Sequence, residues 1–126
     1  MGSPSDQHRY NDVMSASKEE LVLMLYDGAV KFISQAILAI QAEDFTASNK
    51  LIQKAQAIIL EFRATLNMNY DVANNMDQLY IYMHERLIDA NMNKDEAILA
   101  EVRELISDLR DTWKEAMTIA RPDSIE

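Results

Sequence analysis

Residues 17–42 read SKEELVLMLYDGAVKFISQAILAIQA, and this stretch decides the fold. Ser17 followed by Glu20 is a capping box, in which the serine side chain satisfies a free N–H group at the start of a helix. Apolar residues then recur at intervals of three or four as far as Ile40, a spacing that puts them on one face of a helix. The stretch therefore predicts a long amphipathic helix from Lys18 to about Ala42.

The rest of the chain repeats this pattern three times, with short joints between the helices. Only two glycines and two prolines occur in 126 residues, so little interrupts the helices. Long helices with short joints pack antiparallel, which predicts an all-α, antiparallel, up-down four-helix bundle. The further helices are predicted from a cap at Asp44 or Thr46 to about Leu66, from a cap at Asp71 to Ala90, and from a cap at Asp95 to about Ala120, ahead of Pro122. The bundle takes residues 17–121, after a flexible N-terminal arm of residues 1–16 with room for a short helix and before a tail of residues 122–126.

One apolar stripe on each helix is expected to line the core, when residues are placed at 100° per position. The predicted stripes are Leu21, Leu25, Ala29, Phe32, Ile33, Ala36 and Ile40; Leu51, Ala55, Ile58 and Phe62, flanked by Ile52 and Ile59; Val72, Met76, Leu79, Tyr80, Met83 and Leu87; and Ile98, Val102, Leu105, Ile106, Leu109, Trp113 and Ala116.

Three of the helices carry apolar residues beyond these stripes. They are Leu23, Val30 and Ile37 with Tyr26 beside them on the first helix, Leu60 between Ala57 and Ala64 on the second, and Ile81 and Ile88 on the third. On the first helix, burial on two sides of a central helix explains the extra line equally well. Extra lines on three helices favour a partner-binding surface, because contiguous exposed apolar surface usually marks a binding site.

Composition excludes several function classes. The net charge is −9, which repels the phosphates of nucleic acid and an anionic membrane surface. No run of apolar residues is long enough to insert into a bilayer, and the absence of cysteine suits the reducing cytoplasm. His84 has no partner for catalysis or for a metal, so the sequence predicts neither an enzyme nor a cofactor.

Several segments taken together resemble the FliS family of flagellar export chaperones, in the same order and with matching spacing. They include VMSAS at 13–17, MLYDGA at 24–29, KAQAII at 54–59, LYIYM at 79–83 and RDTWK at 110–114. The resemblance covers residues from about 10 to 117. Lys18 stands where the family usually has a proline.

The resemblance implies a cytoplasmic chaperone that binds the C-terminal segment of flagellin in apolar grooves. Such a chaperone prevents early polymerisation and presents its client to the flagellar type III export gate. Tyr10 resembles a tyrosine in the arm of the family, which adds Tyr10 and neighbouring Val13 to the candidate partner-binding residues. The chain is expected to be a monomer with at most weak self-association. The alternative is a structural bundle that uses the second apolar line to form its own oligomer.

Overall fold

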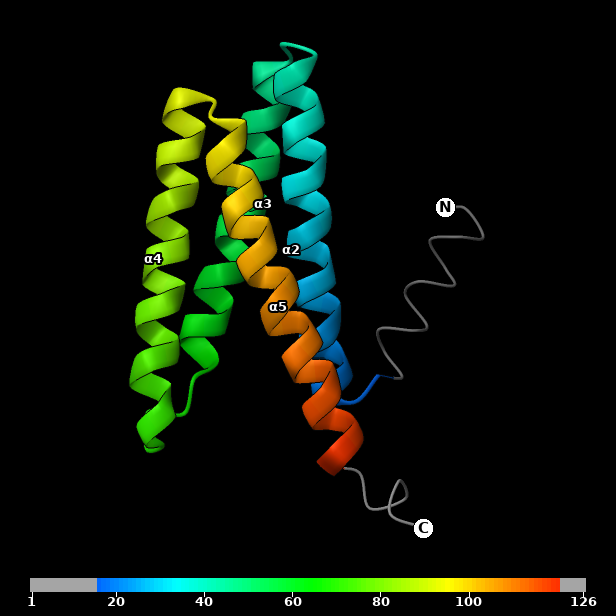
Figure 1. The fold of residues 1–126 in the computed structure, drawn as a ribbon, viewed down its shortest axis with the longest axis vertical. Coiled ribbons are helices and arrows are strands. Elements are labelled where there is room, and N and C mark those ends of the chain that lie inside the picture. Colours follow the sequence, from blue (N-terminus) through cyan, green and yellow to red (C-terminus); the bar gives the residue numbers. More distant parts are fainter. Residues whose placement is uncertain (1–15, 121–126) are drawn as a thin grey trace, which may run out of the picture.

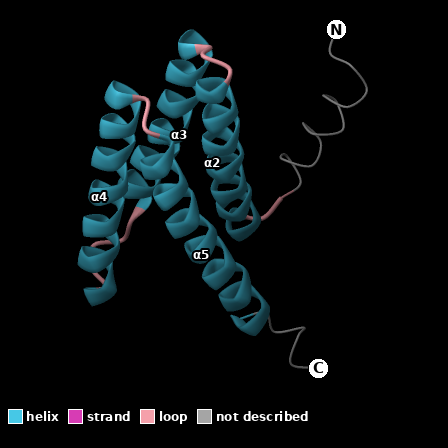
Figure 2. Cartoon of the chain, turned by 45° about the horizontal axis from the view of Figure 1, so that its top comes forward, coloured by secondary structure: helices cyan, strands magenta, loops and turns pink. Residues whose placement is uncertain are grey.

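The computed structural model describes residues 16–120, and within this range it contains four α-helices and no strand (Figures 1 and 2). The helices are α2 (Lys18–Gln41), α3 (Phe45–Thr65), α4 (Asp71–Asn93) and α5 (Glu96–Ala120). The predicted all-α bundle and the number of its helices are confirmed. The predicted tail, nearly all of the predicted arm, and with it Tyr10 and Val13, lie outside the described residues.

Three of the four predicted N-caps are confirmed. Ser17 Oγ accepts a hydrogen bond from the Glu20 backbone N–H at 3.1 Å, and Asp44 Oδ1 accepts one from Ala47 N–H at 3.1 Å. Asp95 Oδ1 accepts from the backbone N–H groups of Ala97 and Ile98 at 2.9 and 3.2 Å. These bonds satisfy donors that have no partner inside the helix.

Both predicted ends of α4 are wrong. Its N-cap is Tyr70, without a side-chain cap bond, and Asp71 is instead the first helical residue, where its carboxylate complements the helix dipole. The helix also continues past Ala90 to Asn93. It ends there because Lys94 adopts the left-handed conformation (φ 51°), and the backbone N–H groups of Lys94 and Asp95 both turn back to the Ala90 carbonyl.

The helices run up and down and follow one another around the bundle. α2 packs most extensively against α3 and α5, and α4 packs between α3 and α5. The α2/α5 and α3/α4 contacts are therefore on opposite sides of the bundle.

The core contains the predicted helix faces, and on α3 and α5 these faces are rotated by a fraction of a turn. Ile52 and Ile59 are fully buried on α3, whereas Leu51 and Ile58 are only half-buried. On α5 the same rotation buries Leu99, which the predicted stripe omits. The fully or almost fully buried apolar residues are Tyr26, Ala29, Ile33, Ala36, Ile40, Ile52, Ala55, Ile59, Phe62, Ala73, Tyr80, Met83, Leu87, Ala90, Leu99, Val102 and Ile106.

The last part of α5 leans away from α4, and this tilt accounts for two errors in the predicted core (Figure 1). Val72 is 62% exposed, since α5 has diverged from α4 at that level. Trp113, predicted to be largely buried, packs against the core, and its Nε1–H donates to the Glu19 carbonyl at 3.0 Å. Ala116 is exposed because only α2 remains beside the end of α5.

Among the described helices, α2 alone is long and apolar enough to pass a length-and-composition test for a membrane span. The core helix of a soluble bundle passes the same test. Five residues of α2 lie in the core, and Val22, Leu25, Val30, Phe32 and Ile37 pack against it.

Candidate partner-binding surface

Two polar contacts fix the register of α3 against α4. Asn91 Nδ2 donates to Asn49 Oδ1 at 2.7 Å near one end, and Arg63 Nε donates to Asp77 Oδ1 at 2.8 Å near the other. The hydrogen bond from Arg63 holds the pKa of the Asp77 carboxyl below its usual value. Both pairs belong to the same antiparallel register, in which residue 60 lies opposite residue 80 or 81.

Between these contacts, the extra apolar residues of α3 and α4 lie along one line. Leu60 is 46% exposed and lies opposite Ile81, which is half-buried. Ile88 lies two helical turns beyond Ile81 on the same side of α4 and is 38% exposed. Ala57 and Ala64, both exposed, flank Leu60 on the same face of α3. We call Ala57, Leu60, Ala64, Ile81 and Ile88 the α3/α4 seam. Its small alanines leave room for a partner helix between the larger side chains.

The extra line on α2 belongs to a different side of the bundle. Leu23, Val30 and Ile37 are each followed four residues later by a side chain that bonds to α5, and residues four apart share a helix face. The bonds are Arg110 Nε to Asp27 Oδ1 (2.7 Å), Arg103 Nη1 to Ser34 Oγ (3.2 Å) and Gln41 Nε2 to Glu96 Oε1 (2.7 Å).

These three bonds recur at seven-residue intervals on both helices, as in an antiparallel coiled coil. Val30 and Ile37 pack against the core, and Leu23 is half-buried. The structure therefore favours the interpretation in which the extra apolar line of α2 packs within the bundle.

Tyr26 is 4% exposed, so it lies in the core and its predicted place on an open surface is wrong. Its ring centroid is 4.4 Å from that of Phe62, and its hydroxyl shares a hydrogen bond of 2.9 Å with the Tyr80 hydroxyl. This contact links α2 to α4 across the bundle. A buried hydroxyl without such a partner would carry a desolvation penalty of about 1–3 kcal/mol.

A cavity of about 490 Å³ opens above this tyrosine pair, and no pattern in the sequence predicts it. It exists because α5 tilts away from α4, so residues of all four helices surround an unfilled space. Its walls are Val22, Tyr26, Phe62, Thr65, Leu66, Asn67, Tyr70, Met76, Tyr80 and Trp113. The lining is mainly apolar.

Burial raises the pKa of both Tyr26 and Tyr80. A tyrosine in the unfolded chain loses its proton near pH 10, whereas the buried pair keeps its protons to higher pH. The free energy of unfolding should therefore fall as the pH rises above about 10, because the unfolded state is then the one that releases protons.

The double variant Tyr26→Phe/Tyr80→Phe removes both hydroxyls together and leaves no unpaired group in the core. We expect its urea midpoint to fall less than that of the parent between about pH 9 and about pH 11. An equal fall in both proteins would show that the tyrosine pair does not cause the alkaline instability.

The described residues contain no group of three or more His, Cys, Asp or Glu side chains that is placed to hold a metal ion. What they do contain is a small antiparallel bundle with apolar side chains along an outer seam. This combination is typical of proteins that bind another chain rather than of enzymes.

Comparison with known proteins places the chain within that class. A family model described as "Flagellar protein FliS" matches residues 1–120. The chain is 41% identical over 121 residues to a "Flagellar secretion chaperone FliS" of Bacillus subtilis (strain 168), covering 96% of this chain and 91% of the relative. A protein of the same description from Salmonella typhimurium is 35% identical over 106 residues, covering 82% and 78%. The chain belongs to the FliS family of flagellar secretion chaperones, and is therefore an export chaperone and not an enzyme.

Proposed function

We propose that this chaperone binds the C-terminal segment of flagellin along the α3/α4 seam, as a one-to-one complex in the cytoplasm. The observation that carries the proposal is the line of Leu60, Ile81 and Ile88, which the described part of the chain leaves partly open to solvent. An amphipathic helix binds such a line with residues at three- and four-residue intervals. Membership of a secretion chaperone family supports a client destined for export.

Binding along the seam would hold flagellin apart from other flagellin molecules and keep it competent for export. The bound complex would then be presented to the flagellar type III export gate. Tyr10 and Val13 remain part of this proposal through the family resemblance alone.

A pull-down from the lysate of a flagellated cell tests the identity of the client. We expect flagellin to be the main captured chain, identified by mass spectrometry, and capture to be lost when the flagellin lacks its C-terminal segment. Capture of other proteins with flagellin absent from the bound fraction would refute the proposal.

The alternative function is a structural bundle that uses the second apolar line, predicted on three helices, to form its own oligomer. On α2 that line lies beside the bonds between α2 and α5, where it is largely used inside the chain. We therefore expect light scattering to give the monomer mass across a concentration series. A mass that rises to that of a stable oligomer would favour the structural alternative.

A further inference from the structure

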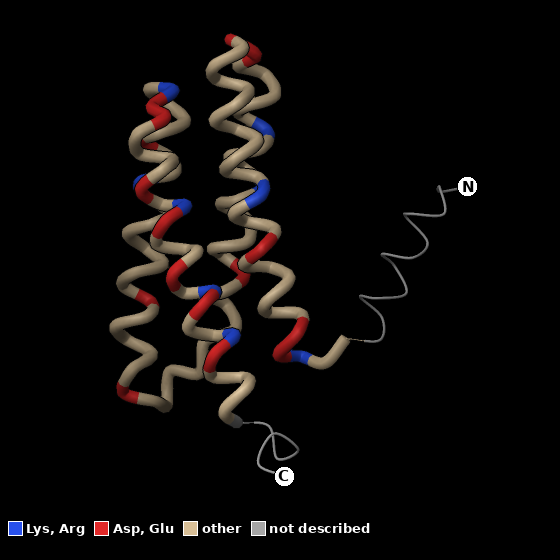
Figure 3. Tube along the Cα trace, turned by 45° about the vertical axis from the view of Figure 1, so that its right-hand side comes forward, with Lys and Arg blue, Asp and Glu red and all other residues tan. Residues whose placement is uncertain are grey.

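The outer face of α2 and α3 has an unusual charge pattern for this chain. The whole sequence carries 21 acidic and 12 basic residues. Along residues 28–42 and 45–60, however, the only charged side chains are Lys31, Lys50 and Lys54. Figure 3 shows this stretch as blue segments without red on the paired helices α2 and α3. A positive face thus lies within an acidic protein.

Contacts between α2 and α3 place the three lysines close together. Lys54 Nζ lies 5.4 Å from the centroid of the Phe32 ring, and a Cβ on Gly28 would lie 3.6 Å from Ile58 Cδ1. Both contacts fit one antiparallel register, which puts Lys31 beside residue 55 and Lys50 beside residue 36. The three lysine positions therefore lie within about one and a half helical turns of one another along the bundle axis.

These lysines have no counter-charge among the described residues. All three side chains are exposed, and no carboxylate in the described part of the chain pairs with any of them. The arginines at 63, 86 and 110 each form an ion pair with an aspartate or glutamate. Like charges on neighbouring helix positions cost stability when nothing compensates them.

Apolar surface accompanies the positive charge. Leu38, seven residues after Lys31 on the same side of α2, is 65% exposed, and Met24, seven residues before it, is 38% exposed. Phe32 is half-buried below Lys54. A partner therefore meets apolar side chains along α2 and ammonium groups on both helices.

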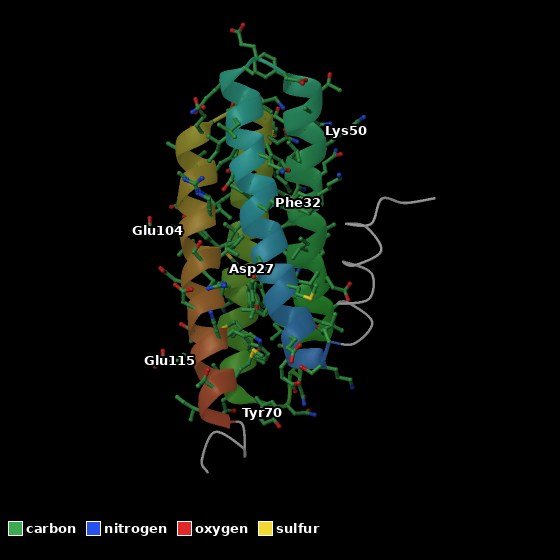
Figure 4. The ribbon with its side chains drawn as sticks, turned by 90° about the vertical axis from the view of Figure 1, so that its right-hand side faces the viewer. Asp27, Phe32, Lys50, Tyr70, Glu104 and Glu115 are labelled. Carbon is green, nitrogen blue, oxygen red and sulfur yellow. The ribbon has the colours of Figure 1, made fainter. Side chains whose placement is uncertain are left out.

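The acidic side chains are concentrated elsewhere. Figure 4 shows Lys50 projecting from α3 on one side of the bundle, and Glu104 and Glu115 projecting from α5 on the other. An acidic partner is thus attracted to one face and repelled from the opposite one, which orients its approach.

We propose that this lysine face, Lys31, Lys50 and Lys54 with Leu38, Met24 and Phe32, binds an acidic amphipathic segment of a partner protein. None of these six residues belongs to the α3/α4 seam, which the face adjoins at Ala57, seven residues after Lys50 on the same side of α3. The segment therefore binds beside a client held in the seam. Its carboxylates pair with the lysines, and its apolar side chains cover Leu38 and Met24.

The probe for the test is a fluorescein-labelled helical peptide of about 18 residues, long enough to hold a helix, with leucine on one face and glutamate elsewhere. The control peptide has lysine in place of glutamate. Fluorescence anisotropy is measured with the full chain at about 50 mM and about 300 mM salt, since exposed ion pairs weaken as salt is added.

Two variants with the same charge change separate the face from the net charge. Lys50→Glu/Lys54→Glu and Lys18→Glu/Lys114→Glu each remove two positive charges and add two negative ones, which takes the net charge from −9 to −13, and all four lysines are exposed. Circular dichroism confirms that each variant is folded, and Lys50→Gln/Lys54→Gln serves as a milder pair.

We expect the acidic peptide to bind the parent, to bind roughly tenfold or more weakly to Lys50→Glu/Lys54→Glu, and to bind more weakly at high salt. Lys18→Glu/Lys114→Glu should change its affinity much less, and the affinity for the flagellin C-terminal segment should be kept in both variants. Ile81→Glu should leave peptide binding unchanged, which keeps this test independent of the proposed function.

Four results would overturn the inference. They are no binding of the acidic peptide, an equal loss in both charge variants, a parallel loss of flagellin binding in Lys50→Glu/Lys54→Glu, and binding of the same lysines to phosphatidylserine vesicles in preference to the peptide.

Discussion

Replacing Met83 with glutamate should unfold the bundle at neutral pH. Met83 is completely buried in the middle of α4, where it packs within the core. A carboxylate there would lose its hydration without gaining a partner, which costs several kcal/mol. This cost is comparable to the whole free energy of unfolding of a small domain, about 5–15 kcal/mol. Circular dichroism should report loss of the helical signal or a melting temperature far below that of the parent.

Met92→Glu is the matched control, because Met92 is on the same helix and 77% exposed. It should change the free energy of unfolding by no more than about 0.5 kcal/mol. If Met83→Glu melted as the parent does, the assigned core of α4 would be wrong.

Replacing Ile81 with glutamate should spare the fold and weaken client binding. Ile81 is half-buried at the edge of the α3/α4 seam, so its carboxylate keeps contact with water in the free protein. We expect a loss of stability of about 1 kcal/mol. In the complex the carboxylate would be covered by apolar side chains, which should cost roughly 2 kcal/mol of affinity, or about thirtyfold in Kd.

Val72→Glu is the control for this variant. Val72 lies on the same helix, is 62% exposed and is outside the seam, so the same added charge should leave the affinity close to that of the parent. Calorimetric titration with the flagellin C-terminal segment gives the affinities, and thermal melts give the stabilities. A collapse of the Ile81→Glu fold would place Ile81 in the core, and an unchanged affinity would place the client on another face.

Leu23→Glu tests the two interpretations of the extra line on α2. Leu23 lies beside the α2/α5 bonds and is half-buried, so we expect this variant to lose more stability than client affinity. A larger effect on affinity than on stability would return α2 to the partner surface.

The sequence predicted the helices well because caps and apolar spacing are local signals. Ser17, Asp44 and Asp95 each cap the helix that they precede, and their partners lie only two or three residues away. Membership of the FliS family was recognisable for a similar reason, since short segments recur in order along the chain.

Features that depend on how the helices meet were not predictable in the same way. The tilt of α5 exposes Val72 and Ala116, although both residues have the spacing of core positions. The hydrogen bond between Tyr26 and Tyr80 joins residues 54 apart, and no local pattern announces it. The cavity above this pair follows from the same tilt.

The candidate surface was predicted in part. Leu60, Ile81 and Ile88 face outward along one seam. The apolar spacing on each helix predicts that these residues face outward, but it does not predict which residue of α3 lies beside which residue of α4. The alignment came from Arg63 with Asp77 and Asn49 with Asn91, whose pairing needs the tertiary structure.

The most direct test of the proposed function is a calorimetric titration of the chaperone with full-length flagellin and with flagellin lacking its C-terminal segment. The segment is expected to be unfolded in monomeric flagellin, so its binding couples to ordering. We expect one-to-one binding of the full-length protein, with a large favourable enthalpy and a negative heat-capacity change, and no measurable binding of the truncated one. Binding of the truncated flagellin at full strength would contradict the account.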